Sequence, residues 1–208
     1  MTTVPEDIVD AALWAEEQGY INRDKTVIMG ESYGAFITPI ILADKKGEFP
    51  FAGGIAFAGF YDVEKNLRKD CGEVSSDLAA EDLGWGNWKN KADRQEMRET
   101  SPVNFAGDIQ KPLLIMHGVQ DKSCSYPQAQ LMSNALKKAE VPHALIKLRK
   151  TGHGIGHETH PFYLALIERF LHEVLGGNFE PLSPQEKKSK SKIISVVRDT
   201  TGFFKEFK

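Results

Sequence analysis

The chain has 208 residues, of which 41% are hydrophobic and 26% are charged. These values are typical of one globular domain with a sizeable core. The formal net charge of −3 gives no reason to expect a nucleic acid as a partner. No apolar run is long enough to span a bilayer, and residues 1–10 lack a signal-peptide pattern, so we expect a cytoplasmic protein by default. Two cysteines, Cys71 and Cys124, are too few for a disulfide framework or a metal site, and we expect no cofactor.

The first part of the chain alternates between helical and strand patterns. Residues 6–18 carry apolar side chains on one face and predict a helix, for which Gly19 supplies a stop signal. Residues 26–29 form a short apolar run between charge and glycine, as a buried parallel strand would. An apolar helix is expected over residues 32–42, although an interior proline such as Pro39 typically costs about 3 kcal/mol.

The same alternation continues towards the C-terminus. We expect strands over residues 53–58, 113–117 and 144–148, and helices over residues 127–138 and 161–175. Strands that alternate with helices imply right-handed crossovers and a mainly parallel sheet. The predicted fold class is therefore α/β, with three layers.

Two stretches do not follow this alternation. Residues 60–111 are polar and irregular and carry Trp85 and Trp88, so they form either part of a ligand site at the carboxyl edge of the sheet or a solvated excursion anchored by its tryptophans. Residues 178–208 are expected to be a basic linker, centred on residues 183–192, and an amphipathic tail. The tail's apolar residues lie near helical spacing, although Gly202 weakens a helix there. We expect the tail to pack on the domain formed by residues 1–177 or to contact a partner or membrane surface.

Gly30-Glu31-Ser32-Tyr33-Gly34 matches the nucleophile-elbow pattern. A sharp strand-to-helix turn strains the serine backbone and lifts its hydroxyl clear of the sheet, which requires glycines on both sides. The motif alone occurs by chance, but here a predicted strand ends at Gly30 and a predicted helix begins behind Ser32. We therefore predict Ser32 as a nucleophile.

A serine nucleophile needs a base and an acid that orients the base. In this kind of fold the acid and the histidine follow the serine, in that order, after later strands. Asp121 lies four residues beyond the strand 113–117, and His153 follows the strand 144–148 in Gly152-His153-Gly154. The predicted triad is Ser32, Asp121 and His153.

The other histidines have less favourable positions. His117 ends a strand and is expected to be packed or bonded within a turn, while His143 and His172 are expected to be structural or solvated. His157 and His160 share the loop of His153 and compete with it, but His153 comes first after the strand. A metal pair of His153 and His157 is disfavoured, because glycines at 152, 154 and 156 oppose the helix that such a pair needs.

With these residues placed, the chain resembles the catalytic domain of the prolyl oligopeptidase family of serine peptidases, which has the α/β-hydrolase fold. The resemblance covers roughly residues 5–177 and rests on Gly-Glu-Ser-Tyr-Gly, on Ser101-Pro102, on His117-Gly118 with Asp121, and on Gly152-His153-Gly154. The 32 residues that separate Asp121 from His153 also match the family's common arrangement.

The resemblance implies further roles. The backbone N–H of Tyr33 would supply one oxyanion donor, and Tyr33, Phe60, Tyr61 and Cys124 would fall near a substrate pocket for small residues such as proline or alanine. Phe60 and Tyr61 are aligned only by their place after the second strand, and core packing is the alternative for them. The expected substrates are peptides or small esters and amides.

The sequence also departs from the family. Only about two dozen residues precede the nucleophile strand, so the strands that normally come before it, and that carry the other oxyanion donor, are missing, as is the usual β-propeller. We expect a chain truncated at its N-terminus, which leaves residues 26–29 on an exposed sheet edge. Either the chain is a fragment of a longer protein, or a second copy, another chain or the C-terminal tail covers this edge. Three functions remain open: a serine peptidase, an esterase or acyl-peptide hydrolase on the same fold, and an inactive module that binds a partner.

Overall fold

A computed structural model describes residues 3–43, 51–70, 84–157 and 159–208. Cys71 and residues 71–83 of the expected excursion lie outside these ranges. The helices and strands follow in chain order: α1 (Thr3–Glu17), β1 (Val27–Glu31), α2 (Tyr33–Leu42), β2 (Gly53–Phe57), α3 (Val63–Lys65), α5 (Lys91–Thr100), β3 (Leu113–Gly118), α6 (Tyr126–Lys138), β4 (His143–Leu148), α7 (His160–Leu175), α8 (Pro184–Ile193) and β5 (Ile194–Asp199). Short turns of 3₁₀ or π geometry connect them.

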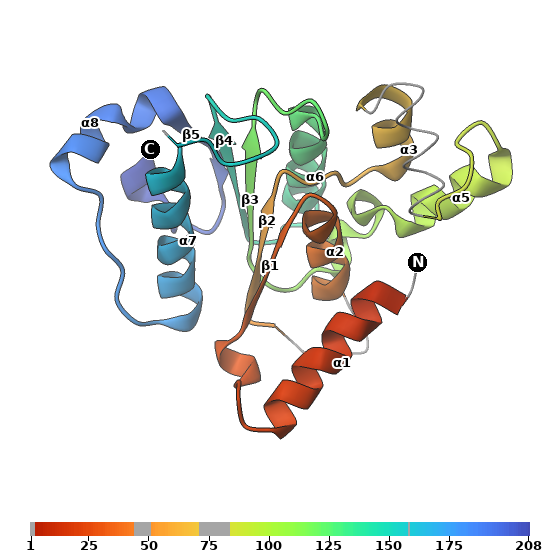
Figure 1. Cartoon of the computed structure of the whole chain (residues 1–208), viewed down its shortest axis with the longest axis horizontal. Helices are drawn as coiled ribbons and strands as arrows, with labels where there is room; N and C mark the ends of the chain where they lie inside the picture. The colour runs from red at the N-terminus through yellow and green to blue at the C-terminus, as the bar shows by residue number, and fades with distance from the viewer. Residues whose placement is uncertain (1–2, 44–50, 71–83, 158) are drawn as a thin grey trace.

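The strands form one five-stranded sheet in the order β1-β2-β3-β4-β5 (Figure 1). The first four strands are parallel, and β5 runs antiparallel to β4. Because parallel strands end at the same edge, the loops after β1, β3 and β4 begin close together. In the part of the chain that the structure describes, the outer edge of β1 pairs with no other strand. The expected cover by the C-terminal tail is wrong, because the tail strand β5 pairs with β4 at the opposite edge. Cover by another chain stays an expectation.

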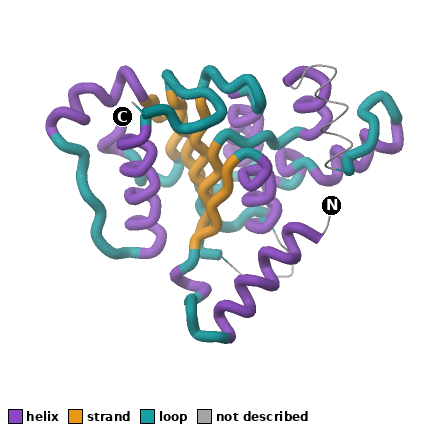
Figure 2. Tube along the Cα trace, viewed as in Figure 1, coloured by secondary structure: helices purple, strands orange, loops and turns teal. Residues whose placement is uncertain are grey.

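Helices cover both faces of the sheet, which gives three layers (Figure 2). On one face lie α2 and α6, with α1 packed outside α2, and on the other lies α7. The buried apolar residues fall into two clusters that correspond to these two faces. The predicted α/β class is confirmed. Within the described ranges, no helix has the length and apolarity needed to cross a membrane.

The elements predicted from periodicity lie within a few residues of those observed. The strand expected over 26–29 runs from Val27 to Glu31, and the helix expected over 32–42 begins one residue later, at Tyr33. Pro39 lies inside α2 without ending it, and the hydroxyl of Thr38 donates to the carbonyl oxygen of Gly34 one turn earlier. The apolar surroundings of this helix hold it together despite the missing N–H.

The prediction of a linker over residues 183–192 was wrong, because these residues form α8. Ser183 caps the helix, accepting a hydrogen bond from the Glu186 N–H while the Glu186 carboxylate accepts one from the Ser183 N–H. Pro184 occupies the first helical position, where its missing N–H costs nothing. The sequence contains this Ser-x-x-Glu capping box, which predicts a helix start, but the high lysine and serine content favoured a linker instead.

The tail after α8 is a strand rather than a helix. Ile194–Asp199 pairs with β4, and a register shift at Leu145/Ile146 accommodates one extra residue on β5. Its β-branched residues favour a pleated strand once a neighbouring edge is available. Phe204 and Phe207 then fold back against the face covered by α7, where both side chains are buried. The tail therefore packs on its own domain.

Phe204 provides a test of this packing. Its side chain is fully buried, so Phe204→Ala is expected to lower the free energy of unfolding by about 3–5 kcal/mol. Val197 lies on β5 in the same C-terminal segment but is 46% exposed, so Val197→Ala is expected to cost less than about 1 kcal/mol. Urea denaturation of both variants checks this, and equal losses would contradict the assigned packing.

His143 is the first residue of β4, the strand that pairs with the C-terminal strand β5. Its Nδ1 lies 2.8 Å from the Val141 carbonyl oxygen, and its Nε2 lies 3.0 Å from the hydroxyl of Ser133. That hydroxyl also accepts a hydrogen bond from the Arg198 guanidinium on β5. Burial lowers the pKa of His143, and the nearby Arg198 charge adds to the effect.

A lowered pKa makes the stability of the fold depend on pH in a definite direction. Below about pH 6.5 the unfolded chain binds a proton at residue 143 that the folded chain resists, so stability falls as the pH drops through this region. The loss in free energy of unfolding between about pH 7 and about pH 5 should be larger for the wild type than for His143→Gln. His157→Gln, at an exposed histidine, is the control and should behave like the wild type.

Candidate active site

Ser32 lies in a strained turn between β1 and α2. Its φ of 56° and ψ of −115° fall outside the regions that an L-residue adopts easily, and its backbone N–H donates to the Phe57 carbonyl oxygen at 2.9 Å. The turn needs a glycine at position 30, because a Cβ there would lie 2.2 Å from the backbone of Gly34. Packing of α2 in the apolar core holds the turn in this conformation.

Ser32, His153 and Asp121 form one hydrogen-bonded series. The Nε2 atom of His153 lies 2.9 Å from the Ser32 Oγ, and its Nδ1 atom lies 2.9 Å from Oδ2 of Asp121. Since the Asp121 carboxylate can only accept, Nδ1 carries the proton and Nε2 accepts from the serine hydroxyl. The structure thus brings together the three residues predicted from strand order.

The environment of Asp121 keeps its carboxylate ionised. Burial raises the pKa, but hydrogen bonds from His117, the Cys124 backbone, His153 and the Ser123 backbone outweigh burial, and the pKa falls to about 2. The backbone N–H groups of Ser123 and Cys124 both donate to Oδ1, at 2.9 and 2.8 Å. A fixed negative charge therefore faces the Nδ1–H of His153 at neutral pH.

The competing histidines lie elsewhere. His157 and His160 are exposed, whereas the His153 side chain is one-third exposed and contacts both Ser32 and Asp121. Among the residues that the structure describes, no three histidine, cysteine, aspartate or glutamate side chains gather as a metal site would require.

Tyr33 is the first residue of α2. The first N–H groups of a helix have no acceptor within the helix and carry its positive end. The backbone N–H of Tyr33 is thus available next to the Ser32 hydroxyl, as an oxyanion donor must be. Its assignment as that donor stays a prediction.

An aromatic cluster extends from Tyr33 into the core. The Tyr33 ring stacks on Phe36 at 5.7 Å, and Phe36 stacks on Phe60 at 4.8 Å. Trp85 touches all three rings, with centroid distances of 6.3 Å to Tyr33, 5.5 Å to Phe36 and 5.4 Å to Phe60. The excursion predicted over 60–111 is therefore anchored beside the serine turn through Trp85.

The remaining predicted pocket residues are buried. Phe60 is 4% exposed, Tyr61 is fully buried and Cys124 is 5% exposed. Burial raises the pKa of Tyr61, and the nearby charge of an ionised Cys124 would add to the effect. The structure places these residues in the core around Tyr33, and a role in binding substrate stays a prediction for them.

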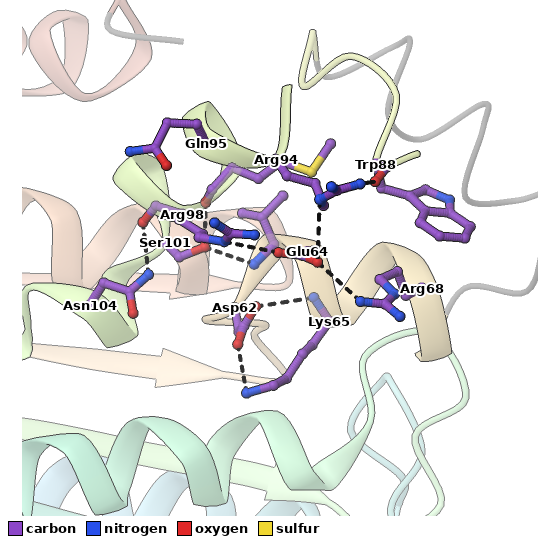
Figure 3. Close-up of polar contacts among 12 residues, drawn as sticks. Asp62, Glu64, Lys65, Arg68, Trp88, Arg94, Gln95, Arg98, Ser101 and Asn104 are labelled. Carbon is purple, nitrogen blue, oxygen red and sulfur yellow. Dashed lines mark hydrogen bonds and ion pairs between the residues drawn. The ribbon is translucent and has the colours of Figure 1, made fainter. Parts of the chain in front are cut away.

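Figure 3 shows how the excursion is tied together around Glu64. The carboxylate of Glu64 accepts hydrogen bonds from Arg68 on one side and Arg98 of α5 on the other, both at 3.1 Å, and lies 4.0 Å from Arg94. The side chains of Arg68 and Arg98 are about half exposed, so each pair contributes at most about 1 kcal/mol. The cluster therefore fixes how α3 and α5 are joined more than it stabilises the fold.

Two neighbours of the site were not identified from the sequence as functional residues. His117 was expected to be packed, and it is fully buried, but its Nε2 also lies 3.4 Å from Oδ2 of Asp121. Trp85 was noted only as an anchor, and it contacts Tyr33. The sequence pair His117-Gly118, shortly before Asp121, could have indicated a role for His117. The contact of Trp85 with Tyr33 depends on how the excursion folds, and the sequence does not indicate it.

Comparison with known proteins identifies the family. The model of the prolyl oligopeptidase family matches residues 2–178. The chain belongs to the prolyl oligopeptidase family. The sequence-based recognition is thereby confirmed, and the α/β-hydrolase fold with it.

Individual relatives agree with this assignment. Dipeptidyl aminopeptidase BIII of Pseudoxanthomonas mexicana is 30% identical over 182 residues, which cover 85% of this chain and 26% of that protein. Dipeptidyl peptidase family member 6 of Caenorhabditis elegans is 28% identical over 206 residues, which cover 91% of this chain and 26% of that protein. This prolyl oligopeptidase family chain therefore spans about a quarter of the length of these relatives.

Solved structures show the same fold at lower identity. A crystal structure of a mutant puromycin hydrolase superposes with a TM-score of 0.74 at 21% identity, covering 86% of this chain and 26% of that one. The acylaminoacyl peptidase of Pyrococcus horikoshii gives a TM-score of 0.69 at 19% identity, covering 88% of this chain and 29% of that one.

The serine turn can be tested with two neighbouring glycines. Gly30→Ala forces a methyl group into the Gly34 backbone and is expected to destabilise the protein by about 1–3 kcal/mol or more. Gly34→Ala adds its methyl group where no atom outside the helix's own backbone lies within 4 Å, and it should leave the free energy of unfolding unchanged or slightly raised. Denaturant unfolding measures both, and a tolerated Gly30→Ala would contradict the tight turn.

Proposed function

We propose that this chain carries the catalytic centre of a serine peptidase that cleaves its substrate through an acyl-enzyme. The observation that supports this most directly is the series from the strained Ser32, through His153, to the ionised Asp121, with hydrogen bonds of 2.9 Å at both ends of the histidine. A strained serine backbone costs free energy of folding, and such strain is concentrated at functional sites.

In the proposed reaction, the Ser32 Oγ attacks the carbonyl carbon of the scissile bond while His153 Nε2 removes the hydroxyl proton. Asp121 keeps the proton of His153 on Nδ1 and balances the charge of the imidazolium that forms. His153 then donates its Nε2 proton to the leaving group, which departs and leaves an ester on Ser32. A water molecule, activated by His153 in the same way, hydrolyses that ester and restores the serine.

The developing negative charge on the carbonyl oxygen needs donors. The Tyr33 N–H is our proposed donor, because it lies at the N-terminus of α2 directly after the nucleophile. In serine proteases, loss of a single such donor typically lowers turnover by about 10²–10³-fold. A centre with the Tyr33 N–H as its one donor would therefore turn over about 10²–10³-fold more slowly than a centre with two donors.

Peptides are the proposed substrates, since the relatives carry the names dipeptidyl aminopeptidase, dipeptidyl peptidase and acylamino-acid-releasing enzyme. Tyr33, Phe60, Tyr61 and Cys124 are the proposed pocket residues, and the resemblance to the family implies a small residue such as proline or alanine at the cleaved bond. Esters, and peptides with an acylated N-terminus, are alternative substrates for the same catalytic centre.

Labelling with a fluorophosphonate probe tests the proposed centre. The folded wild-type chain should be labelled at Ser32, Ser32→Ala should not be labelled, and His153→Ala should react at least about 10³-fold more slowly. His157→Ala, at an exposed histidine of the same loop, is the matched control and should react at the wild-type rate. Mass spectrometry of the adduct identifies the labelled residue.

The outcomes separate the open functions. A folded chain that takes up no probe would refute the enzymatic proposal for this chain and favour the partner-binding module. If Ser32 is labelled, turnover of proline- and alanine-anilides is then compared with turnover of short-chain esters. Equal or faster turnover of the esters would count against a peptidase and favour an esterase.

A further inference from the structure

We propose that His117 is a positioning residue for Asp121: its Nε2–H ties the loop after β3 to the sheet and thereby aims the Asp121 carboxylate at His153. This inference rests on the proposed function, because positioning matters only if the centre of Ser32, His153 and Asp121 is catalytic. The residue itself touches neither the nucleophile nor the substrate carbonyl.

The location of His117 already sets it apart from a surface histidine. It lies near the carboxyl end of β3, its side chain is fully buried, and its ring meets the ring of Tyr126 edge-on at 6.0 Å. A histidine ring is costly to bury unless its polar atoms have partners. Its Nε2 atom has two of them.

Both partners of Nε2 are acceptors, which determines where the proton lies. The Cys124 carbonyl oxygen is 2.8 Å away, and Oδ2 of Asp121 is 3.4 Å away. Neither atom can donate, since the Asp121 carboxylate is ionised. Nε2 must therefore carry the hydrogen, which it donates to the Cys124 carbonyl oxygen, while the Asp121 carboxylate lies farther away as a charged neighbour.

The other ring nitrogen supports the same tautomer. In the described part of the chain, Nδ1 of His117 is buried and has no hydrogen-bond partner. A proton there would be a buried donor without an acceptor, which typically costs about 1–3 kcal/mol. The neutral ring with its proton on Nε2 avoids this cost.

The His117 bond completes a closed set of contacts around Asp121. The N–H groups of Ser123 and Cys124 hold Oδ1, and the Cys124 carbonyl oxygen in turn is held by His117. The loop is therefore attached to β3 at a point directly beside the carboxylate. Oδ2 lies between the two histidine rings, 3.4 Å from Nε2 of His117 and 2.9 Å from Nδ1 of His153.

The same strand end is also joined to the loop of His153. The Gln120 N–H donates to the Thr151 carbonyl oxygen at 2.9 Å, and a Cβ on Gly118 would lie 2.3 Å from that oxygen. The two loops are thus in direct contact, so a shift of the Asp121 loop changes the distance to His153. His117 is the side chain that resists this shift from within the core.

Nitrogen-15 NMR of the intact chain tests the inference without any activity. The His117 ring should show a proton on Nε2 and none on Nδ1. The ring N–H of His153 that faces Asp121 should give a sharp, slowly exchanging signal in the wild type, persist in His117→Gln and broaden or vanish in His117→Phe. The glutamine amide can replace the Nε2–H donor, whereas phenylalanine keeps a ring but donates nothing.

Labelling kinetics give the second readout. His117→Phe should lower the rate of fluorophosphonate labelling of Ser32 by about tenfold or more, as other groups that orient a functional residue do, and His117→Gln should restore most of it. The matched control is His143→Gln, at a buried histidine of the neighbouring strand, which should leave the rate unchanged. In an Asp121→Ala background, His117→Phe should have little further effect, because the two residues act as one unit.

Several results would overturn the inference. A His117 proton on Nδ1, or an unchanged His153 signal in folded His117→Phe, excludes positioning through the Nε2–H whether or not the chain is active. Equal losses in His117→Phe and His117→Gln, or full additivity with Asp121→Ala, assign His117 to packing alone. If the wild type takes up no probe, the proposed function fails, and the NMR results still decide the role of His117.

Discussion

The buried carboxylate of Asp121 is the group on which the geometry of the site depends. A charge removed from water must be paired, and here backbone N–H groups hold one oxygen while two histidine rings approach the other. These contacts leave the carboxylate little freedom to rotate. The orientation of His153, and through it the contact with the Ser32 hydroxyl, follows from this one fixed group.

The parallel sheet supplies the second requirement. β1, β3 and β4 end at the same edge, so the turn of Ser32 and the loops of Asp121 and His153 meet although 121 residues separate the serine from the histidine. The strained backbone of Ser32 is held by α2, whose buried face packs against the aromatic cluster that contains Trp85. Strain at the site is thus offset by burial elsewhere in the same domain.

The chain contains this arrangement within about a quarter of the length of its relatives. Its C-terminal segment adds β5 to one side of the sheet and covers the face of α7 with phenylalanine side chains. At the other side, β1 forms the edge of the described sheet. The three residues of the proposed centre come from the turn after β1 and from the loops after β3 and β4.

Local patterns in the sequence determined most of the elements and the identity of the site residues. Periodicity located the first four strands and their helices, because burial of one face imposes a regular spacing, and Gly30 marks a turn at Ser32 in which a Cβ would collide with the backbone. Only the tertiary structure decided that the residues after α8 form β5 and that His117 contacts Asp121. A strand needs a neighbouring edge, and a buried histidine bonds whichever acceptors the fold brings to it. The strand β4 lies far along the chain from β5, and no sequence pattern in either segment marks the pairing. The acceptors of His117 lie only four and seven residues ahead of it, but the fold of that short loop decides which of them its Nε2 atom meets.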